Sequence, residues 1–284
     1  MNWIKTGVLM ASLMALFMLA GHAIAGPQGV RMAFFMALAM NFFSYWFSDK
    51  IVLAMYRAKP VSEEEAPGLH ELVAQLAERA GIPKPRICVI PSETPNAFAT
   101  GRSPSKGVVA VTTGIMRILD KRELAGVIAH ELSHIKHRDT LISTIAATIA
   151  AAISYLGYLA LFFGGGRRDG EGGNPLAALM MFILAPIAAG VIQMAISRSR
   201  EYAADERGAR IAGEAGGLAS ALQKLERGPA MQAFRGAETT ENLFIVNPFR
   251  GGRGVSSFAK LFSTHPATAE RVARLQELSG ELGG

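Results

Sequence analysis

The stretch DKRELAGVIAHELSHIKHRD, residues 120–139, decides how the whole chain is interpreted. It contains His130, Glu131 and His134 in the pattern H-E-x-x-H. On a helix the two histidines lie one turn apart on the same face, so both can direct a ring nitrogen at one metal ion. Glu131 flanks the same point and can remove a proton from a water molecule there. The pattern therefore predicts a catalytic metal site on a helix.

The stretch is predicted to be helical for reasons that do not depend on its histidines. Asp120 and Glu123 have the spacing of a capping box, which satisfies the free N–H groups at a helix start. Leu119 can pack on Leu124 as a hydrophobic staple. An apolar stripe at helical spacing follows, made of Leu124, Val127, Ile128 and Ile135.

Two histidines and a base do not complete a catalytic zinc site, which needs a third protein ligand and an open position. His137 follows His134 by three residues. It lies about 10 Å along the helix axis from His130, too far to share one ion with bonds near 2 Å. The third ligand must come from elsewhere in the chain. The alternative is a helix with two solvated or otherwise satisfied histidines and no metal.

The composition indicates a membrane protein with a modest soluble part. Of the 284 residues, 50% are hydrophobic and only 18% are charged, and the mean hydropathy is +0.25. The net charge of +6 could suggest nucleic acid, but the basic residues flank apolar runs, where membrane topology explains them. The single cysteine, Cys88, excludes an internal disulfide and a multi-thiolate site, and we interpret it as a buried strand residue.

Four apolar runs are predicted to cross the membrane: residues 7–25, 32–47, 140–163 and 176–196. The first resembles a secretory signal, but the second follows so closely that a retained anchor is favoured. The third is predicted to continue the helix of residues 120–139 that carries the two histidines, here called the metal helix. The runs divide the chain into two N-terminal spans (1–56), a first catalytic part (57–139), a membrane hairpin (140–196) and a second catalytic part (197–284).

The distribution of basic residues predicts the orientation of these spans. One side of the membrane receives most of them, namely Lys5, Lys50, Arg57, Lys59, Lys136, Arg138, Arg198 and Arg200. The opposite side receives Arg31, Arg167 and Arg168, the last two beside acidic residues. By the positive-inside rule, both termini and the soluble part are expected in the cytoplasm.

The soluble parts predict a small sheet beside the metal helix. A helix is expected from the Ser62/Glu65 capping box to Gly81, followed by strands at residues 86–90, 96–100 and 107–113. One sheet edge could receive an extended peptide by strand addition, although 96–100 can also be read as a plain hairpin arm. Further on, we expect a helix carrying Leu218, Leu222 and Leu225, a short strand at 243–246 and a closing helix through Leu278.

The membrane hairpin points to the third ligand. Two spans separate His134 from Glu201, so the chain crosses the membrane and returns to the same face. Glu201 is the first carboxylate after the hairpin, and Asp205 follows one helical turn later. Glu201 is therefore a candidate third ligand, and Asp205 a candidate to orient a ligand histidine. The alternative is a solvated helix start whose acidic residues are favoured by the helix dipole.

A last histidine, His265, stands directly before Pro266, where a closing helix is predicted to start. It could be a surface cap, or it could lean into the site and stabilise an oxyanion. Spacing alone does not distinguish the two.

Four motifs together resemble the HtpX family of membrane-bound zinc metalloproteases, relatives of the CAAX-prenyl protease. They are H-E-L-S-H-I-K-H-R-D at 130–139, R-S-R-E-Y-A-A-D at 198–205, N-A-F-A at 96–99 and T-H-P at 264–266. The resemblance implies a gluzincin-type fold, mostly α with a small β-sheet (α+β), anchored by about four transmembrane helices. It also implies one Zn²⁺ per chain, and cleavage of misfolded or damaged membrane proteins from the cytoplasmic side of the bacterial inner membrane.

The resemblance also implies a role for each matching residue. His130, His134 and Glu201 would bind zinc, Glu131 would be the general base and Asp205 would support a ligand. His265 would be a transition-state donor, and the substrate strand would be Asn96, Ala97, Phe98 and Ala99. The competing hypothesis is a non-catalytic scaffold or a transporter with a structural metal. Transporters place ionisable groups inside their spans, whereas here these groups cluster at the span ends, which favours the enzyme.

Overall fold

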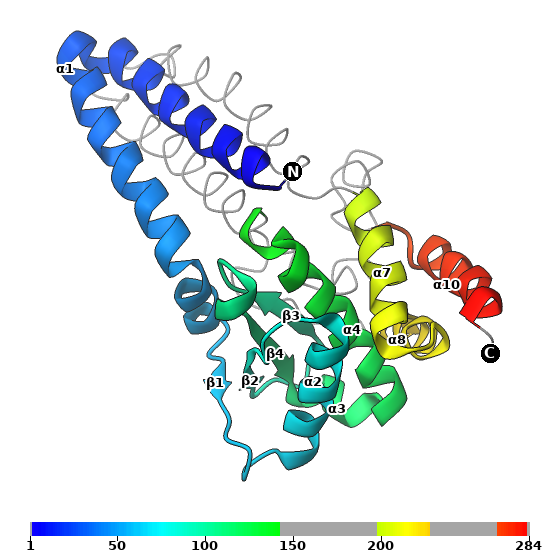
Figure 1. Cartoon of the computed structure of the whole chain (residues 1–284). Coiled ribbons are helices and arrows are strands. Elements are labelled where there is room, and N and C mark those ends of the chain that lie inside the picture. Colours follow the sequence, from blue (N-terminus) through cyan, green and yellow to red (C-terminus); the bar gives the residue numbers. More distant parts are fainter. Residues whose placement is uncertain (1, 143–197, 228–265, 283–284) are drawn as a thin grey trace, which may run out of the picture.

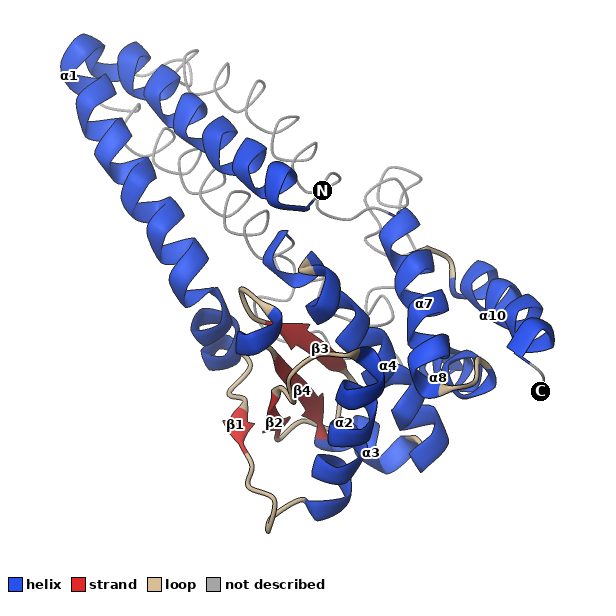
Figure 2. Cartoon of the chain, viewed as in Figure 1, coloured by secondary structure: helices blue, strands red, loops and turns tan. Residues whose placement is uncertain are grey.

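The computed structural model describes residues 2–142, 198–227 and 266–282 (Figure 1). These residues form a mostly helical molecule around one small sheet, as the sequence predicted (Figure 2). Several predictions lie outside the described residues: the third span beyond Ile142, the fourth span, the strand at 243–246 and His265.

The sheet is mixed, with the strand order β1-β2-β4-β3. Its members are β1 (Lys59–Pro60), β2 (Arg86–Ile90), β3 (Ala97–Thr100) and β4 (Val108–Thr112). β2 and β4 run parallel, and the other pairs are antiparallel. The three strands expected from the sequence are confirmed, whereas the two-residue β1 was not predicted.

Both faces of the sheet are covered, which explains why β4 is buried along its whole length. Val109 and Val111 belong to the main core, with residues of the neighbouring helices. Val108 and Ala110 point the other way, into a second cluster with Val52, Leu53, Tyr56, Cys88, Ile90 and Phe98. The end of the first helix therefore packs directly on the back of the sheet. Cys88 is buried in β2, as predicted.

The first helix, α1 (Asn2–Met55), is folded into two antiparallel arms (Figure 1). The fold lies at Gly26, whose φ is +56°, next to Pro27. The arms lie in contact, because the side chain of Asn41 donates a hydrogen bond to the carbonyl of Met10 over 3.2 Å. A Cβ at Gly21 would lie only 2.4 Å from the carbonyl oxygen of Gly29, so this close approach requires glycine.

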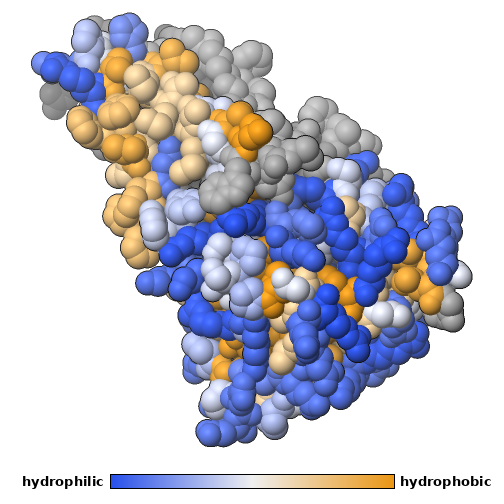
Figure 3. Space-filling view, viewed as in Figure 1, coloured by the Kyte–Doolittle hydropathy of each residue, from blue (hydrophilic) through white to orange (hydrophobic). Residues whose placement is uncertain are grey.

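The two arms correspond to the first two predicted spans. Among the described residues, Gly26–Phe47 is long and apolar enough to cross a membrane, and Thr6–Leu19 is a shorter apolar helix. Large apolar side chains are exposed along both arms, for example Phe35 with 67% of its surface accessible. Figure 3 shows this apolar extension beside a mainly hydrophilic body. An exposed apolar surface of this extent is typical of contact with lipid.

The second helix, α2 (Pro67–Ala80), begins later than the sequence predicted. Ser62 and Glu65 do make the reciprocal hydrogen bonds of a capping box, but these bonds enclose a turn. Pro67 disfavours helical torsions at the residue before it, and Ala66 accordingly has φ −143° and ψ 60°. The helix therefore begins only at the proline.

The metal helix, α4 (Lys121–His137), follows the short α3 (Thr113–Ile118). The predicted capping box of Asp120 and Glu123 is confirmed in both directions. The predicted continuation of α4 into the third span is wrong. Arg138 has the left-handed torsions φ 59° and ψ 28°, which end the helix before residues 139–142 resume helical structure.

Three later helices complete the core: α7 (Arg198–Ala212), α8 (Gly216–Arg227) and α10 (Thr268–Leu282). Both α7 and α8 pack against α4, and α10 packs against both of them (Figure 1). The predicted apolar face of α8 is confirmed, because Leu218, Leu222 and Leu225 are buried.

Glycines allow α4 to lie unusually close to its two partners. A Cβ on Gly208 of α7 would lie 2.8 Å from the backbone nitrogen of His130 and 2.9 Å from its Cα. A Cβ on Gly126 of α4 would lie 2.6 Å from the backbone nitrogen of Leu218. These contacts are with backbone atoms, so a larger residue would push whole helices apart.

We expect Gly208→Ala to destabilise the protein by about 1–3 kcal/mol, because overpacking against backbone cannot be relieved by a side-chain rotation. The matched control is Gly68→Ala in α2, where an added Cβ meets nothing within 4 Å. Denaturant unfolding of both variants in detergent measures the difference. Equal midpoints for the two variants would contradict the prediction.

Candidate active site

Helix α4 brings the two histidines of the motif to one point. His130 and His134 lie on one helical face, and their Nε2 atoms are 3.1 Å apart. The two rings are nearly perpendicular, with centroids 4.7 Å apart. His130 is buried, and only 14% of the His134 side chain is accessible. Two ring nitrogens at this separation either share a proton or face one cation.

Helix α7 adds a carboxylate at the same point. Glu201, in its first turn, has one oxygen 3.8 Å from the Nε2 of His130 and the other 3.6 Å from the Nε2 of His134. A ligand atom from each of these three residues lies within 4.8 Å of the other two. Within the described ranges this is the one cluster of three or more His, Cys, Asp or Glu side chains that could hold a metal ion. His137 does not belong to it.

These three side chains fit a zinc ion. Four ligands placed tetrahedrally at about 2.0–2.1 Å from zinc are about 3.3 Å from one another. The observed separations of 3.1, 3.6 and 3.8 Å scatter around that value. Two imidazoles and one carboxylate are also a donor set used by catalytic zinc sites, which keep the fourth position open.

Each histidine has a carboxylate behind it. The Nδ1 of His130 lies 2.9 Å from Asp205, and the Nδ1 of His134 lies 3.3 Å from Asp139. A proton held on each Nδ1 leaves the Nε2 lone pairs facing the cluster. Burial alone would lower the pKa of His134, but Asp139, Glu201 and Glu131 together raise it to about 9. A metal ion must therefore displace a proton on binding.

Asp205 is itself held by an arginine from α10. Arg271 donates two hydrogen bonds to the carboxylate, over 2.8 and 2.7 Å, and both side chains are buried. Burial would raise the pKa of Asp205, but the charge and hydrogen bonds of Arg271 lower it to about 2. The pair thus stabilises the fold above the ordinary pKa of 3.8, and this contribution is lost as the pH falls toward 2.

The sequence reasoning missed Arg271 as part of the site. The sequence could have indicated that Arg271 is buried. It lies four residues before Leu275 and seven before Leu278, and so on the apolar face of the closing helix. A single arginine in a buried stripe needs a buried acidic partner. The sequence does not say which acid that is.

Glu131 lies beside the cluster and is almost fully buried. Burial raises its pKa, while the two histidines and a hydrogen bond from the backbone of Ala99 act in the opposite direction. A carboxyl with a raised pKa is suited to accept and return a proton near neutral pH.

Strand β3 passes close to Glu131 and contains three of the four residues of the predicted substrate strand. In the part of the chain that the structure describes, β3 is the last strand of the sheet, and it packs against α4. Ala97 and Ala99 face the core that contains α4. Phe98 points to the opposite face, with its ring 5.2 Å from that of Tyr56. Asn96 precedes the strand and is paired with Thr112 of β4.

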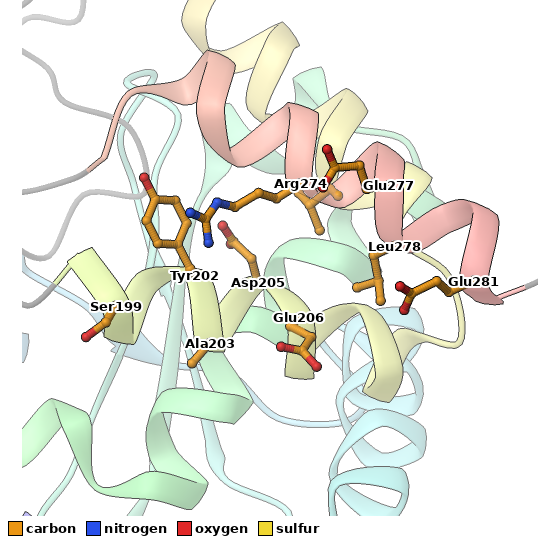
Figure 4. Close-up of a pocket in the computed structure, with 10 residues that line it drawn as sticks. Ser199, Tyr202, Ala203, Asp205, Glu206, Arg274, Glu277, Leu278 and Glu281 are labelled. Carbon is orange, nitrogen blue, oxygen red and sulfur yellow. The ribbon is translucent and has the colours of Figure 1, made fainter.

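A pocket of about 630 Å³ lies between α7 and α10, behind Asp205 (Figure 4). Arg274 stacks on the ring of Tyr202 at 3.8 Å, and the Tyr202 hydroxyl donates a hydrogen bond to Glu270 over 2.5 Å. The described lining of this pocket comes from α7 and α10 and does not include the three clustered side chains. These polar contacts join α10 to α7 at the surface, beside the buried pair of Arg271 and Asp205.

Comparison with known proteins agrees with this geometry. The model of peptidase family M48 matches residues 63–279, well over half of the chain. The chain belongs to peptidase family M48. It is therefore a metalloprotease, and the expected resemblance to the HtpX family is confirmed by its relatives.

Several proteins that are similar to this chain are named "Protease HtpX homolog". That of Pyrococcus furiosus is 55% identical over 99% of this chain and 97% of its own length. That of Salinibacter ruber is 56% identical over 99% of both chains. These relatives favour the enzyme over the scaffold or transporter with a structural metal.

A solved structure shares the fold. The crystal structure of S. mikatae Ste24p superimposes with a TM-score of 0.54 and 19% sequence identity, and the match covers 96% of this M48 chain. The chain spans only 65% of the length of Ste24p. The likeness supports an M48 metalloprotease fold that is mostly helical with a small mixed sheet.

We expect Arg271→Met to destabilise the protein by about 3–5 kcal/mol, because it leaves the Asp205 charge buried without a partner. Arg274→Met is the control, since Arg274 is exposed and its contact with Tyr202 contributes about 0.5–1 kcal/mol. Denaturant unfolding in detergent compares the two. A loss for Arg271→Met no larger than that for Arg274→Met would refute the prediction.

Proposed function

We propose that this metalloprotease is a zinc endopeptidase that cleaves misfolded or damaged membrane proteins at the cytoplasmic face of the cell inner membrane. The proposal of a zinc site rests on one observation. Donor groups from His130, His134 and Glu201 approach one buried point. M48 membership and the HtpX relatives support the peptidase activity.

In this proposal His130, His134 and Glu201 hold one Zn²⁺ per chain. When bound, zinc supplies a Lewis acid that polarises the scissile carbonyl and lowers the pKa of water toward neutrality. Asp205 keeps the proton on the Nδ1 of His130, so that its Nε2 remains a ligand. Arg271 in turn holds Asp205 in position.

Glu131 is the proposed general base. It accepts the proton of the attacking water and later passes that proton to the leaving amine. Support comes from its burial, its raised pKa and its place next to His130. The N–H of Ala99 orients the carboxylate from the side of β3.

The substrate is proposed to add as an extended strand alongside β3, at Asn96, Ala97, Phe98 and Ala99. Main-chain hydrogen bonds would provide most of the recognition, so an unfolded conformation matters more than a particular sequence. Phe98 contributes backbone only, because its side chain packs against Tyr56 on the other face. Such selection suits the removal of damaged proteins.

His265 remains a proposed transition-state donor that assists in stabilising the oxyanion. This role rests on the resemblance of T-H-P at 264–266, and His265 lies outside the described residues. Pro266 and Ala267 separate His265 in the sequence from α10, the helix that carries Arg271 to the site.

The membrane arrangement is proposed to be multi-pass, with about four helices and both termini in the cytoplasm. The exposed apolar arms of α1 support contact with lipid. The basic residue Lys50 lies in the last part of the second arm and Arg57 follows that arm, and Arg198 and Arg200 begin α7. Lysine and arginine are retained on the cytoplasmic side of spans.

We expect Glu131→Gln to bind zinc but to lose cleavage by at least about 100-fold, because the amide cannot accept the proton. His134→Ala should lose zinc as well as activity, since a ligand is removed. Zinc analysis of the purified proteins, with cleavage of a fluorescent, permanently unfolded polypeptide, measures both effects. Proteolysis by Glu131→Gln at the wild-type rate would remove Glu131 from this role.

The orientation is testable with single cysteines in a Cys88→Ala background. Gln28→Cys, at the fold of α1, should react with a membrane-impermeant maleimide in spheroplasts, because that end of the hairpin faces outward. Glu64→Cys, in the catalytic part, should react only after the membrane is opened. The reverse labelling pattern would place the catalytic part on the outside.

A further inference from the structure

The metal helix ends at an unusual residue. Arg138 has φ 59° and ψ 28°, and its backbone N–H closes the last turn of α4 on the carbonyls of His134 and Ile135. These left-handed torsions are sparsely populated by residues other than glycine, asparagine and aspartate. Maintaining them in an arginine costs free energy, and such residues concentrate at functional sites.

The left-handed residue changes where the next side chain can lie. In an uninterrupted helix, a residue five positions after His134 would be about 140° around the axis from it. Asp139 would then face away from the imidazole. With α4 ended at Arg138, Asp139 instead lies with one carboxylate oxygen 3.3 Å from the Nδ1 of His134, and it is buried.

Neighbouring contacts hold this turn in place. The hydroxyl of Thr140 donates a hydrogen bond to the carbonyl of Gly101, in the loop after β3. Leu141 and Ile142 are buried. Arg200, which precedes Glu201 in α7, is near enough for its charge to act on Asp139. The turn is therefore held from the loop after β3, and the charge of Arg200 in α7 acts on the carboxylate.

We infer that Asp139 is a positioning residue for His134, and that the left-handed Arg138 serves to bring it there. The inference rests on the proposed function, in which His134 is a metal ligand. A carboxylate that accepts the Nδ1 proton fixes the tautomer and the ring orientation, and so presents the Nε2 lone pair to the metal. Each ligand histidine then has its own carboxylate, Asp205 for His130 and Asp139 for His134.

The experiment measures the zinc dissociation constant of the full-length protein in detergent by chelator competition. We expect Asp139→Leu to raise this constant by about 10–100-fold, the usual effect of losing a hydrogen-bond partner of a ligand. Asp139→Asn should fall between Asp139→Leu and the wild type, since its amide oxygen still accepts the Nδ1 proton. Glu93→Gln is the matched control, because Glu93 is exposed and pairs only with Arg117 among the described contacts.

The backbone part of the inference has its own pair of variants. Arg138→Gly accepts the left-handed torsions without strain and should bind zinc within about twofold of the wild type. Arg138→Val disfavours these torsions and should weaken zinc binding as Asp139→Leu does. Unfolding of the metal-free proteins is measured in parallel. A positioning role predicts that zinc binding weakens more than the stability of the metal-free chain does.

Wild-type zinc affinity in folded Asp139→Leu would overturn the inference. If that variant does not fold, Arg138→Val decides, and unchanged zinc affinity in it would overturn the inference equally. His134→Ala separates this failure from a failure of the proposed function. If His134→Ala still binds zinc normally, the ligand assignment is wrong; if it loses zinc while Asp139 and Arg138 variants do not, only the positioning role is wrong.

Discussion

The structure depends on the close contact of α4 with α7. Gly208 lets the backbone of α7 lie against that of His130, and this approach sets the Glu201 carboxylate beside the two imidazoles. Burying several ionisable groups together is costly unless each is paired or holds a metal. The cluster therefore requires a set of neighbours that compensates its charges, and much of the surrounding structure supplies them.

One of those neighbours comes from a distant part of the chain and another from close by. Arg271 reaches Asp205 from the C-terminal helix, and Asp139 reaches His134 from just beyond α4. Arg274 of α10 stacks on Tyr202 of α7 (Figure 4). The Tyr202 hydroxyl also donates a hydrogen bond to Glu270 of α10. The C-terminal helix is thus part of the catalytic unit, since without it Asp205 would be a buried charge lacking its cation.

The sheet connects this catalytic unit to the apolar arms. The end of α1 packs on the back of the sheet through Val52, Leu53 and Tyr56. On the other face the sheet packs against α4, and its last described strand, β3, supplies the Ala99 N–H that bonds Glu131. Packed side chains therefore join the apolar arms of α1, through the sheet, to the strand that contacts Glu131.

Much of this arrangement follows from local rules and was predictable. The H-E-x-x-H spacing, the Asp120/Glu123 capping box and the strand at 86–90 each depend on residues that are near one another in the chain. Where a neighbouring residue changed the torsions, local patterns failed. Pro67 delayed the start of α2, and the left-handed Arg138 ended α4 where an apolar continuation was expected.

By itself, the sequence determined the helix that carries the two histidines and the apolar runs, because periodicity and spacing express them directly. Only the tertiary structure decided which charges meet. Arg271 and Asp205 are 66 positions apart, and no local rule pairs them. Asp139 lies 3.3 Å from His134 after Arg138 takes left-handed torsions. The first pairing depends on packing between distant elements, and the second depends on a backbone conformation that arginine rarely adopts, so neither follows from residue spacing.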